Sequence, residues 1–297
     1  METAVFVQHM VNGLSLGSLF ALVAIGYTMV YTILSMINFA HGDIFMMSIY
    51  FAFFAVSSFH MPWVLALFCV IATTPVIGAL IERFAYRPLR DAPKNSVLIS
   101  AIGASFLLEN AATYLFGGRP KALPDIPVLT RVITIQSVNF QVVSIVIPII
   151  TFVLLAVLLN FINRTKTGIA MRAVAQDYEI ARVMGVNINW IISLTFIIGS
   201  ALAAVGGFMW GVRYPGITPT MGVMPGLKCF VAAVVGGIGD IKGAVVGGFI
   251  LGLGEIMIVA LFPGISGYRD AFAFVLLIVI LLVKPTGILG SKAREKV

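Results

Sequence analysis

The chain has 297 residues, of which 60% are hydrophobic and only 10% are charged, and its mean hydropathy is +1.06. A soluble globule of this length needs far more polar surface, so the composition excludes one and indicates a polytopic membrane protein. The net charge of +7 comes without a basic patch interleaved with aromatic residues, so nucleic-acid binding is not indicated.

Long apolar runs without two-residue alternation predict membrane-spanning helices and exclude a β-barrel. The approximate spans are 10–33, 40–59, 62–82, 97–116, 141–162, 190–212, 226–240, 243–262 and 268–284. The run 226–240 is short for a crossing and contains Lys228, which favours a broken or re-entrant helix there. We therefore expect an all-α polytopic membrane protein in which residues 1–297 form a single transmembrane domain of about eight to ten helices.

Lysine and arginine are distributed unevenly between the two sides of the predicted membrane. If the loop 83–96 faces the cytoplasm, 13 of these residues fall on that side and 5 on the other. The cytoplasmic group is Arg83, Arg87, Arg90, Lys94, Arg164, Lys166, Arg172, Arg182, Lys242, Lys284, Lys292, Arg294 and Lys296; the opposite group is Arg119, Lys121, Arg131, Arg213 and Arg269. Because cytoplasmic loops carry an excess of basic residues, we expect an outside N-terminus and a cytoplasmic C-terminus. The segment 164–188 is then cytoplasmic, and 117–140 is a periplasmic loop.

Few polar residues fall within the predicted spans, and each is a candidate for a pathway or structural role. A charge at the centre of a bilayer costs roughly 3 kcal/mol, so such residues are kept at interfaces, in cavities or for function. Asn38, His41 and Asp43 lie where the first apolar run gives way to the second, either in an interfacial turn or at a helix break that reaches into the bundle.

Three more polar residues, Glu109, Asn110 and Glu255, lie deeper in their spans. The two glutamates are candidates for buried, paired carboxylates. They serve either in structural hydrogen bonds or on a transport pathway.

The motifs that would indicate catalysis or cofactor binding are missing. Cys69 and Cys229 fall within spans at a spacing that matches no zinc or haem motif. The glycine-rich segment 236–243 lacks the Gly-Lys-Ser/Thr ending of a phosphate loop, and no Gly-x-Ser-x-Gly elbow is present. We therefore expect no catalytic residue, no cofactor or metal, and no ATP binding by this chain.

Pairs of glycines four residues apart recur within the predicted helices. Such pairs let helix backbones approach closely in lipid and usually mark helix contacts. The pairs are Gly13/Gly17, Gly207/Gly211, Gly243/Gly247 and Gly248/Gly252.

The segment 164–187 is unusually polar, with six charged residues in 24. Its apolar residues recur at helical spacing, which predicts an amphipathic helix that begins at Thr167 as N-cap and ends at Gly185. This helix either lies on the membrane surface or docks a soluble partner.

Several motifs along the chain resemble those of one transporter family. The run Ala175-x-Asp177-x-x-x-Ala181-x-x-x-Gly185 is similar to the coupling motif of ABC importer permeases, although Ala173-Val-Ala175 replaces the usual Glu-Ala-Ala. The remaining motifs are Asn12-Gly-x-x-x-Gly17-Ser with its continuation to Tyr31, Ile37-Asn-Phe-Ala-His-Gly42, Ile81-Glu-Arg-x-Ala-Tyr-Arg-Pro88, Ser100-Ala-Ile-Gly103, Gly236-Gly-Ile-Gly239 and Pro285-Thr-Gly-Ile-Leu-Gly290. Together they resemble the LivH-type permease of the high-affinity branched-chain amino acid transport systems, over essentially the whole chain.

The resemblance implies a multi-pass permease of the bacterial inner membrane that works in a complex. Its partners would be a homologous LivM-type permease, two cytoplasmic subunits that bind and hydrolyse ATP, and a periplasmic protein that delivers leucine, isoleucine or valine. Ala175, Asp177, Ala181 and Gly185 would form the element that couples this chain to an ATPase. Two alternatives remain: an ABC permease for urea or short amides, and an ion-coupled secondary transporter that uses Glu109 and Glu255.

Overall fold

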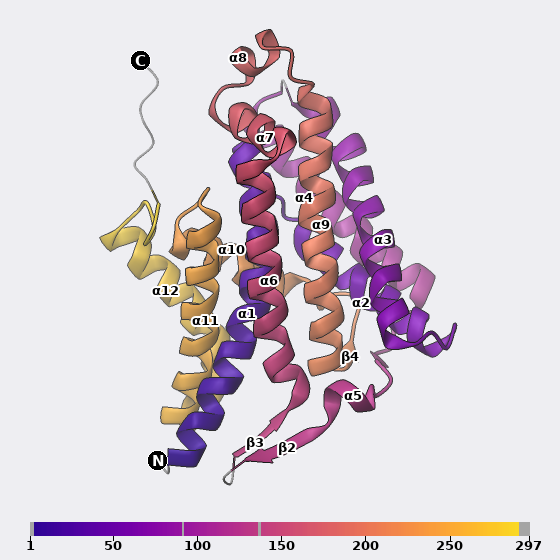
Figure 1. Cartoon of the computed structure of the whole chain (residues 1–297), viewed down its shortest axis with the longest axis vertical. Helices are drawn as coiled ribbons and strands as arrows, with labels where there is room; N and C mark the ends of the chain where they lie inside the picture. Colours follow the sequence, from indigo (N-terminus) through magenta and orange to yellow (C-terminus); the bar gives the residue numbers. More distant parts are fainter. Residues whose placement is uncertain (1–2, 91, 136–137, 291–297) are drawn as a thin grey trace.

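The computed structural model describes residues 3–90, 92–135 and 138–290, whose elements form an elongated helical bundle (Figure 1). In this part of the chain, seven helices are long and apolar enough to cross a membrane, the last of them together with the end of η3. They are α1 (Thr3–Leu34), α3 (Trp63–Ile81), α4 (Lys94–Phe116), α6 (Val142–Arg164), α9 (Ile188–Arg213), α11 (Ile241–Leu261) and α12 (Arg269–Val283). Short helical turns follow α3 and precede α12, namely η1 (Glu82–Tyr86), η2 (Arg87–Leu89) and η3 (Pro263–Tyr268). The mostly helical architecture agrees with the expected polytopic membrane protein.

Two further apolar helices are shorter: α2 (His41–Ser57) has 17 residues and α10 (Val223–Gly236) has 14. Both begin inside the bundle, because Gly42 in the first turn of α2 lies against the backbone of Gly222 and Gly226 at the start of α10. The broken helix expected near 226–240 is therefore α10. For 40–59, however, the sequence predicted a full crossing and the structure shows a helix that starts halfway.

The two ends of the bundle differ (Figure 1). One end holds the start of α1 and two small antiparallel sheets, in which β1 pairs with β4 and β2 with β3. The opposite end holds α7 and α8. The bounds of these elements are β1 (Lys121–Ala122), α5 (Pro127–Thr130), β2 (Val132–Ile135), β3 (Val138–Gln141), α7 (Lys166–Gln176), α8 (Tyr178–Val183) and β4 (Gly216–Ile217). We refer to them as the strand end and the α7–α8 end.

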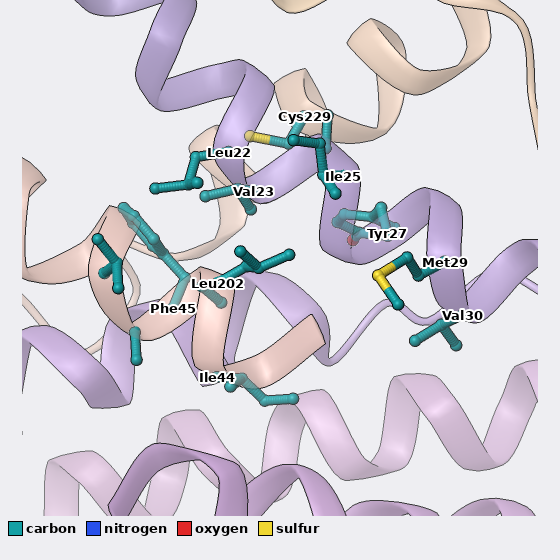
Figure 2. Close-up of a cluster of buried hydrophobic side chains, with 14 of the residues drawn as sticks. Leu22, Val23, Ile25, Tyr27, Met29, Val30, Ile44, Phe45, Leu202 and Cys229 are labelled. Carbon is teal, nitrogen blue, oxygen red and sulfur yellow. The ribbon is translucent and has the colours of Figure 1, made fainter. Parts of the chain in front are cut away.

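Helix α1 forms the centre of the bundle, and most of its side chains from Leu16 onward are buried. Around it, apolar side chains of α2, α9 and α10 complete the core (Figure 2). The labelled examples are Leu22, Val23, Ile25, Tyr27, Met29 and Val30 of α1, Ile44 and Phe45 of α2, Leu202 of α9 and Cys229 of α10.

The four predicted glycine pairs all lie at helix contacts. Gly13 and Gly17 of α1 face α11, and a methyl group at Gly17 would lie 2.9 Å from the Cα of Phe249. On α11, Gly248 and Gly252 face α1 in return. The other two pairs bring α9 against α2 and α11 against α10; they are Gly207/Gly211 and Gly243/Gly247. This prediction is confirmed.

Part of the sequence-based orientation rests on residues outside the described ranges. These are Lys292, Arg294 and Lys296, together with the C-terminal residue itself. The described residues nevertheless place the charged segment 164–187 and the segment 117–140 at opposite ends of the bundle (Figure 1).

Candidate functional site

The charged segment at the α7–α8 end consists of two helices, not the single amphipathic helix expected. Asp177 separates them with an extended backbone at φ −155°. Its Oδ1 accepts hydrogen bonds from the backbone N–H groups of Glu179 and Ile180 at 2.8 and 3.1 Å. A side-chain acceptor at this position satisfies the N–H groups that begin a helix, so Asp177 fixes where α8 starts.

The start of α7 also differs from the prediction. The side chain of Thr165, not that of Thr167, accepts a hydrogen bond from the backbone N–H of Gly168, at 3.0 Å. Thr165 therefore caps α7, two residues earlier than expected, because its extended backbone places the hydroxyl over the first turn.

Gly185 ends α8 as predicted, with φ +81°. The N–H groups of Val186 and Gly185 donate to the carbonyls of Ala181 and Arg182, each at 3.0 Å, which is the Schellman arrangement of a helix end. This conformation costs a residue with a side chain roughly 1–2 kcal/mol, so glycine suits the position.

The four predicted coupling residues shape this segment more than they form its surface. Ala181 is buried and Ala175 is half-buried, while Asp177 and Gly185 set the two ends of α8. Three exposed side chains of α8 are apolar and lie on one side of the helix, and we call them the α8 face; they are Ile180, Val183 and Met184, exposed by 64%, 86% and 78%. Clustered apolar side chains on an exposed helix mark a contact surface.

Side chains outside the predicted set anchor α8 to the bundle. The Tyr178 hydroxyl donates to the carbonyl of Ile33 at the end of α1. Burial raises the pKa of this hydroxyl above its ordinary value, and nearby Arg90 lowers it in part, so the hydroxyl remains a donor at neutral pH. Arg90 in turn pairs with buried Glu82, which also accepts from Ser193 of α9 at 2.7 Å. Sequence reasoning did not identify the pair of Glu82 and Arg90 as part of this anchor. The feature that could have indicated it is the presence of two opposite charges eight residues apart beside an apolar span.

The three polar residues at the start of α2 lie inside the bundle, not at an interfacial turn. Asn38, His41 and Asp43 are 1%, 1% and 2% exposed. The Asn38 Oδ1 accepts from the Tyr86 hydroxyl at 3.1 Å, and the His41 ring meets the ring of Tyr27 edge-on at 4.7 Å. The helix break that reaches into the bundle is thus the alternative that the structure supports.

Glu109 and Asn110 of α4 face different surroundings. Asn110 is exposed, and its Nδ2 donates to the Phe106 carbonyl one turn earlier at 2.7 Å. Glu109 is half-buried and lines a cavity together with Asp43. Glu109 is therefore not fully buried and makes no ion pair among the described residues, unlike the buried, paired carboxylate for which it was a candidate.

Glu255, by contrast, is buried and paired twice. Its Oε1 lies 2.7 Å from Lys228 Nζ, and its Oε2 accepts from Arg269 Nε at 2.8 Å. Lys228 also lies 2.6 Å from Asp270, so the four charges join α10, α11 and α12. A buried carboxylate satisfied in this way has a structural role.

A cavity of about 330 Å³ lies where α2 and α10 begin. Residues of α1, α2, α4 and α10 line it, and they include Asp43, Glu109 and Ser105. No cluster of three or more histidine, cysteine, aspartate or glutamate residues suited to a metal ion occurs in the described ranges.

Comparison with known proteins decides the family. Residues 9–281 match the family described as "Branched-chain amino acid transport system / permease component". The chain belongs to this family. The permease is 45% identical, over 303 residues and 98% of each chain, to the high-affinity branched-chain amino acid transport system permease protein BraD of Pseudomonas aeruginosa. It is 43% identical, again over 98% of each chain, to LivH of Escherichia coli K12.

Among solved structures, the permease resembles PsaBC from Streptococcus pneumoniae in complex with Fab. The TM-score is 0.51 at 12% identity, covering 93% of this chain and 91% of that chain, so the likeness concerns the fold alone. The resemblance to LivH-type permeases that the sequence motifs indicated is thereby confirmed over almost the whole length.

Proposed function

We propose that this permease is the membrane subunit of an ABC importer that moves branched-chain amino acids across the bacterial inner membrane. The observation that carries the proposal is the 45% and 43% identity, over 98% of each chain, to permeases named for high-affinity branched-chain amino acid transport. Seven apolar spans and two half-length helices give it the multi-pass form that such a subunit needs.

The distribution of basic residues supports an orientation for the proposal. The α7–α8 end is cytoplasmic and carries Arg164, Lys166, Arg172 and Arg182, whereas the strand end faces the periplasm. The N-terminus then lies outside, and the segment between α4 and α6 is a periplasmic loop that a delivering protein can reach.

The α8 face supports the proposed partners. An exposed apolar surface on a short, capped helix suits insertion into a groove of a soluble protein, which in this proposal is one of two cytoplasmic ATPase subunits. ATP is bound and hydrolysed there, and this chain is not itself an enzyme. A second, homologous permease supplies the other half of the path, and a periplasmic binding protein delivers leucine, isoleucine or valine.

The anchors of α8 provide a physical route for coupling. Tyr178 ties α8 to Ile33 at the end of α1. Phe39, which lines the cavity just before α2, follows Ile33 by only six residues. ATP binding favours one state of the bundle only if the ATPase contacts differ between the inward and outward states. Because Tyr178 ties α8 to the end of α1, movement of α8 carries that end of α1 with it, and alternating access follows.

The two alternatives receive less support. Of the two glutamates that an ion-coupled transporter would use, Glu255 is held by both Lys228 and Arg269, which leaves Glu109 alone as a carboxylate without an ion pair among the described residues. Urea and short amides have no ammonium group for the two carboxylates of the cavity to bind. None of the relatives at 43–45% identity is named for such a cargo.

Uptake by a reconstituted complex tests the proposal. We expect vesicles that contain this permease, the second permease, both ATPases and the binding protein to accumulate radiolabelled leucine only with ATP. Val183→Asp should abolish both ATPase co-purification and uptake, because it places a charge at the centre of the α8 face. Glu179→Gln on the same exposed helix is the matched control and should leave both unchanged.

Two results would contradict parts of the proposal. Leucine accumulation by this chain alone in a proton gradient would favour the ion-coupled alternative. Normal uptake by Val183→Asp would contradict the proposed role of the α8 face in binding the ATPase, but not the proposed cargo.

A further inference from the structure

The cavity at the starts of α2 and α10 has one wall made by a single face of α4. Ile102, Ser105, Phe106 and Glu109 all line it, and their spacing of three and four residues places them on one side of the helix. The opposite wall comes from the first turns of the two half-length helices. Side chains and helix ends from four elements thus converge on one space.

The charges in this cavity are unbalanced. Its described lining residues include Asp43 and Glu109 but neither lysine nor arginine. Ser105 donates to Oδ2 of Asp43, whereas Oδ1 is buried and has no hydrogen-bond donor among the described residues. A buried acceptor left without a partner costs about 1–3 kcal/mol, and more when it is charged, so Oδ1 points to a donor that a ligand brings.

The start of α10 offers the opposite charge preference. Gly222 and Val223 line the cavity, and the first turn of α10 carries no acidic side chain. Because the Val223 N–H donates to the Thr220 carbonyl and Pro225 has no N–H, the attraction of this helix start for an anion such as a carboxylate comes chiefly from the helix dipole. In α2, by contrast, Asp43 itself occupies the first turn.

The rest of the lining is apolar and the cavity is open. Ile102 and Phe106 of α4 face Leu227 of α10, which gives an aliphatic group a place beside the polar ones. Phe106 and Val223 are 59% and 40% exposed, so the cavity reaches the outer surface of this chain. Its volume of about 330 Å³ suits a small molecule.

We propose that this cavity binds the zwitterion of an aliphatic amino acid during transport. The ammonium group lies between Asp43 and Glu109, and the carboxylate lies at the start of α10. The aliphatic side chain packs against Ile102, Phe106 and Leu227. This inference rests on the proposed function and adds to it the part of the chain that meets the cargo.

Removal of one negative charge tests the inference in the assembled transporter. Asp43→Asn keeps the size of the side chain and its acceptor for Ser105 but loses the charge. We expect leucine uptake to fall about tenfold or more, because the ammonium group loses one charge-assisted hydrogen bond. The amount of the permease in the membrane and its co-purification with the ATPase should stay normal. Asp240→Asn is the matched control, because asparagine caps α11 as well as aspartate does and the residue lies outside this cavity.

The possible failures are distinguishable. Wild-type uptake by Asp43→Asn would overturn the cavity assignment and leave the proposed function standing. A wild-type complex that accumulates no branched-chain amino acid would instead overturn the proposed function.

A binding measurement without the periplasmic protein isolates the ammonium contact. We expect the purified permease–ATPase complex to bind leucine and 3-methylbutylamine, and to bind 4-methylpentanoate, which lacks the amino group, at least about tenfold more weakly. Equal binding of the amine and the acid in saturation-transfer NMR would overturn the assignment. Should Asp43→Asn fail to assemble, Glu109→Gln replaces it, and it should weaken binding of the amine more than binding of the acid.

Discussion

At the scale of single residues, the contrast between Asp43 and Glu255 is the most informative. Both carboxylates are almost completely buried. Glu255 is neutralised by two cations, whereas Asp43 has one hydroxyl donor and a second oxygen that no donor in the described part of the chain reaches. Because a membrane makes uncompensated charge expensive, the first arrangement stabilises the bundle, and the second is the one that our proposal assigns to a ligand.

The ion cluster gives a prediction about stability. Glu255→Gln should lower the free energy of unfolding by about 3–5 kcal/mol, since it leaves two cations near the core without their shared partner. Asp270→Asn is the control: this side chain is 56% exposed, so its loss should cost no more than about 1 kcal/mol. Thermal unfolding of the detergent-solubilised chain would measure both, and equal midpoints would contradict the assignment.

At the scale of elements, helix contacts in this protein depend on glycine backbones. Helix α11 presents one pair of glycines to α1 and another to α10, so it packs closely on two sides. A helix without bulky side chains on those sides gains van der Waals contact, which is what associates helices in lipid.

A methyl group placed in the α1–α11 contact should therefore be costly. Gly252→Ala would push a carbon into the backbone of Gly17, and we expect a loss of about 1–3 kcal/mol in stability. Gly103→Ala in α4 is the matched control, because a Cβ there meets no atom within 4 Å. Comparable unfolding temperatures for the two variants would show that this contact is not tightly packed.

Sequence periodicity predicted the long helices and the glycine contacts because both depend on local pattern. It left the break before α2 as one of two alternatives, because 40–59 is apolar enough for a crossing and only the tertiary contact of Gly42 with Gly222 decides between them. The cavity likewise depends on tertiary contact, since its walls come from residues more than 100 positions apart. The division of the charged segment at Asp177 could have been predicted from the sequence, since aspartate is a preferred N-cap residue.

At the scale of the whole molecule, the bundle is asymmetric between its ends. The charged helices occupy one end and the small sheets the other (Figure 1). The bias of basic residues predicts which end faces the cytoplasm.

Cysteine labelling in intact cells would check this orientation. Val128→Cys at the strand end should react with a membrane-impermeant maleimide, because Val128 is 61% exposed and this end is periplasmic in our proposal. Glu179→Cys at the α7–α8 end should react only after permeabilisation. The parent chain, with Cys69 and Cys229, gives the background, and the reverse labelling pattern would invert the proposed topology.

The two half-length helices receive their connecting backbone from opposite faces of the molecule. Residues 35–40 descend to α2 from the end of α1 to which Tyr178 of α8 is tied, whereas residues 218–222 lead to α10 from strand β4, which is paired with β1. A movement at either membrane surface can therefore alter the cavity at the starts of α2 and α10 through only a few residues of backbone. In the proposed importer, arrival of a cargo-loaded protein on one side and nucleotide exchange on the other would both be sensed at this common point, without a long relay through the helices.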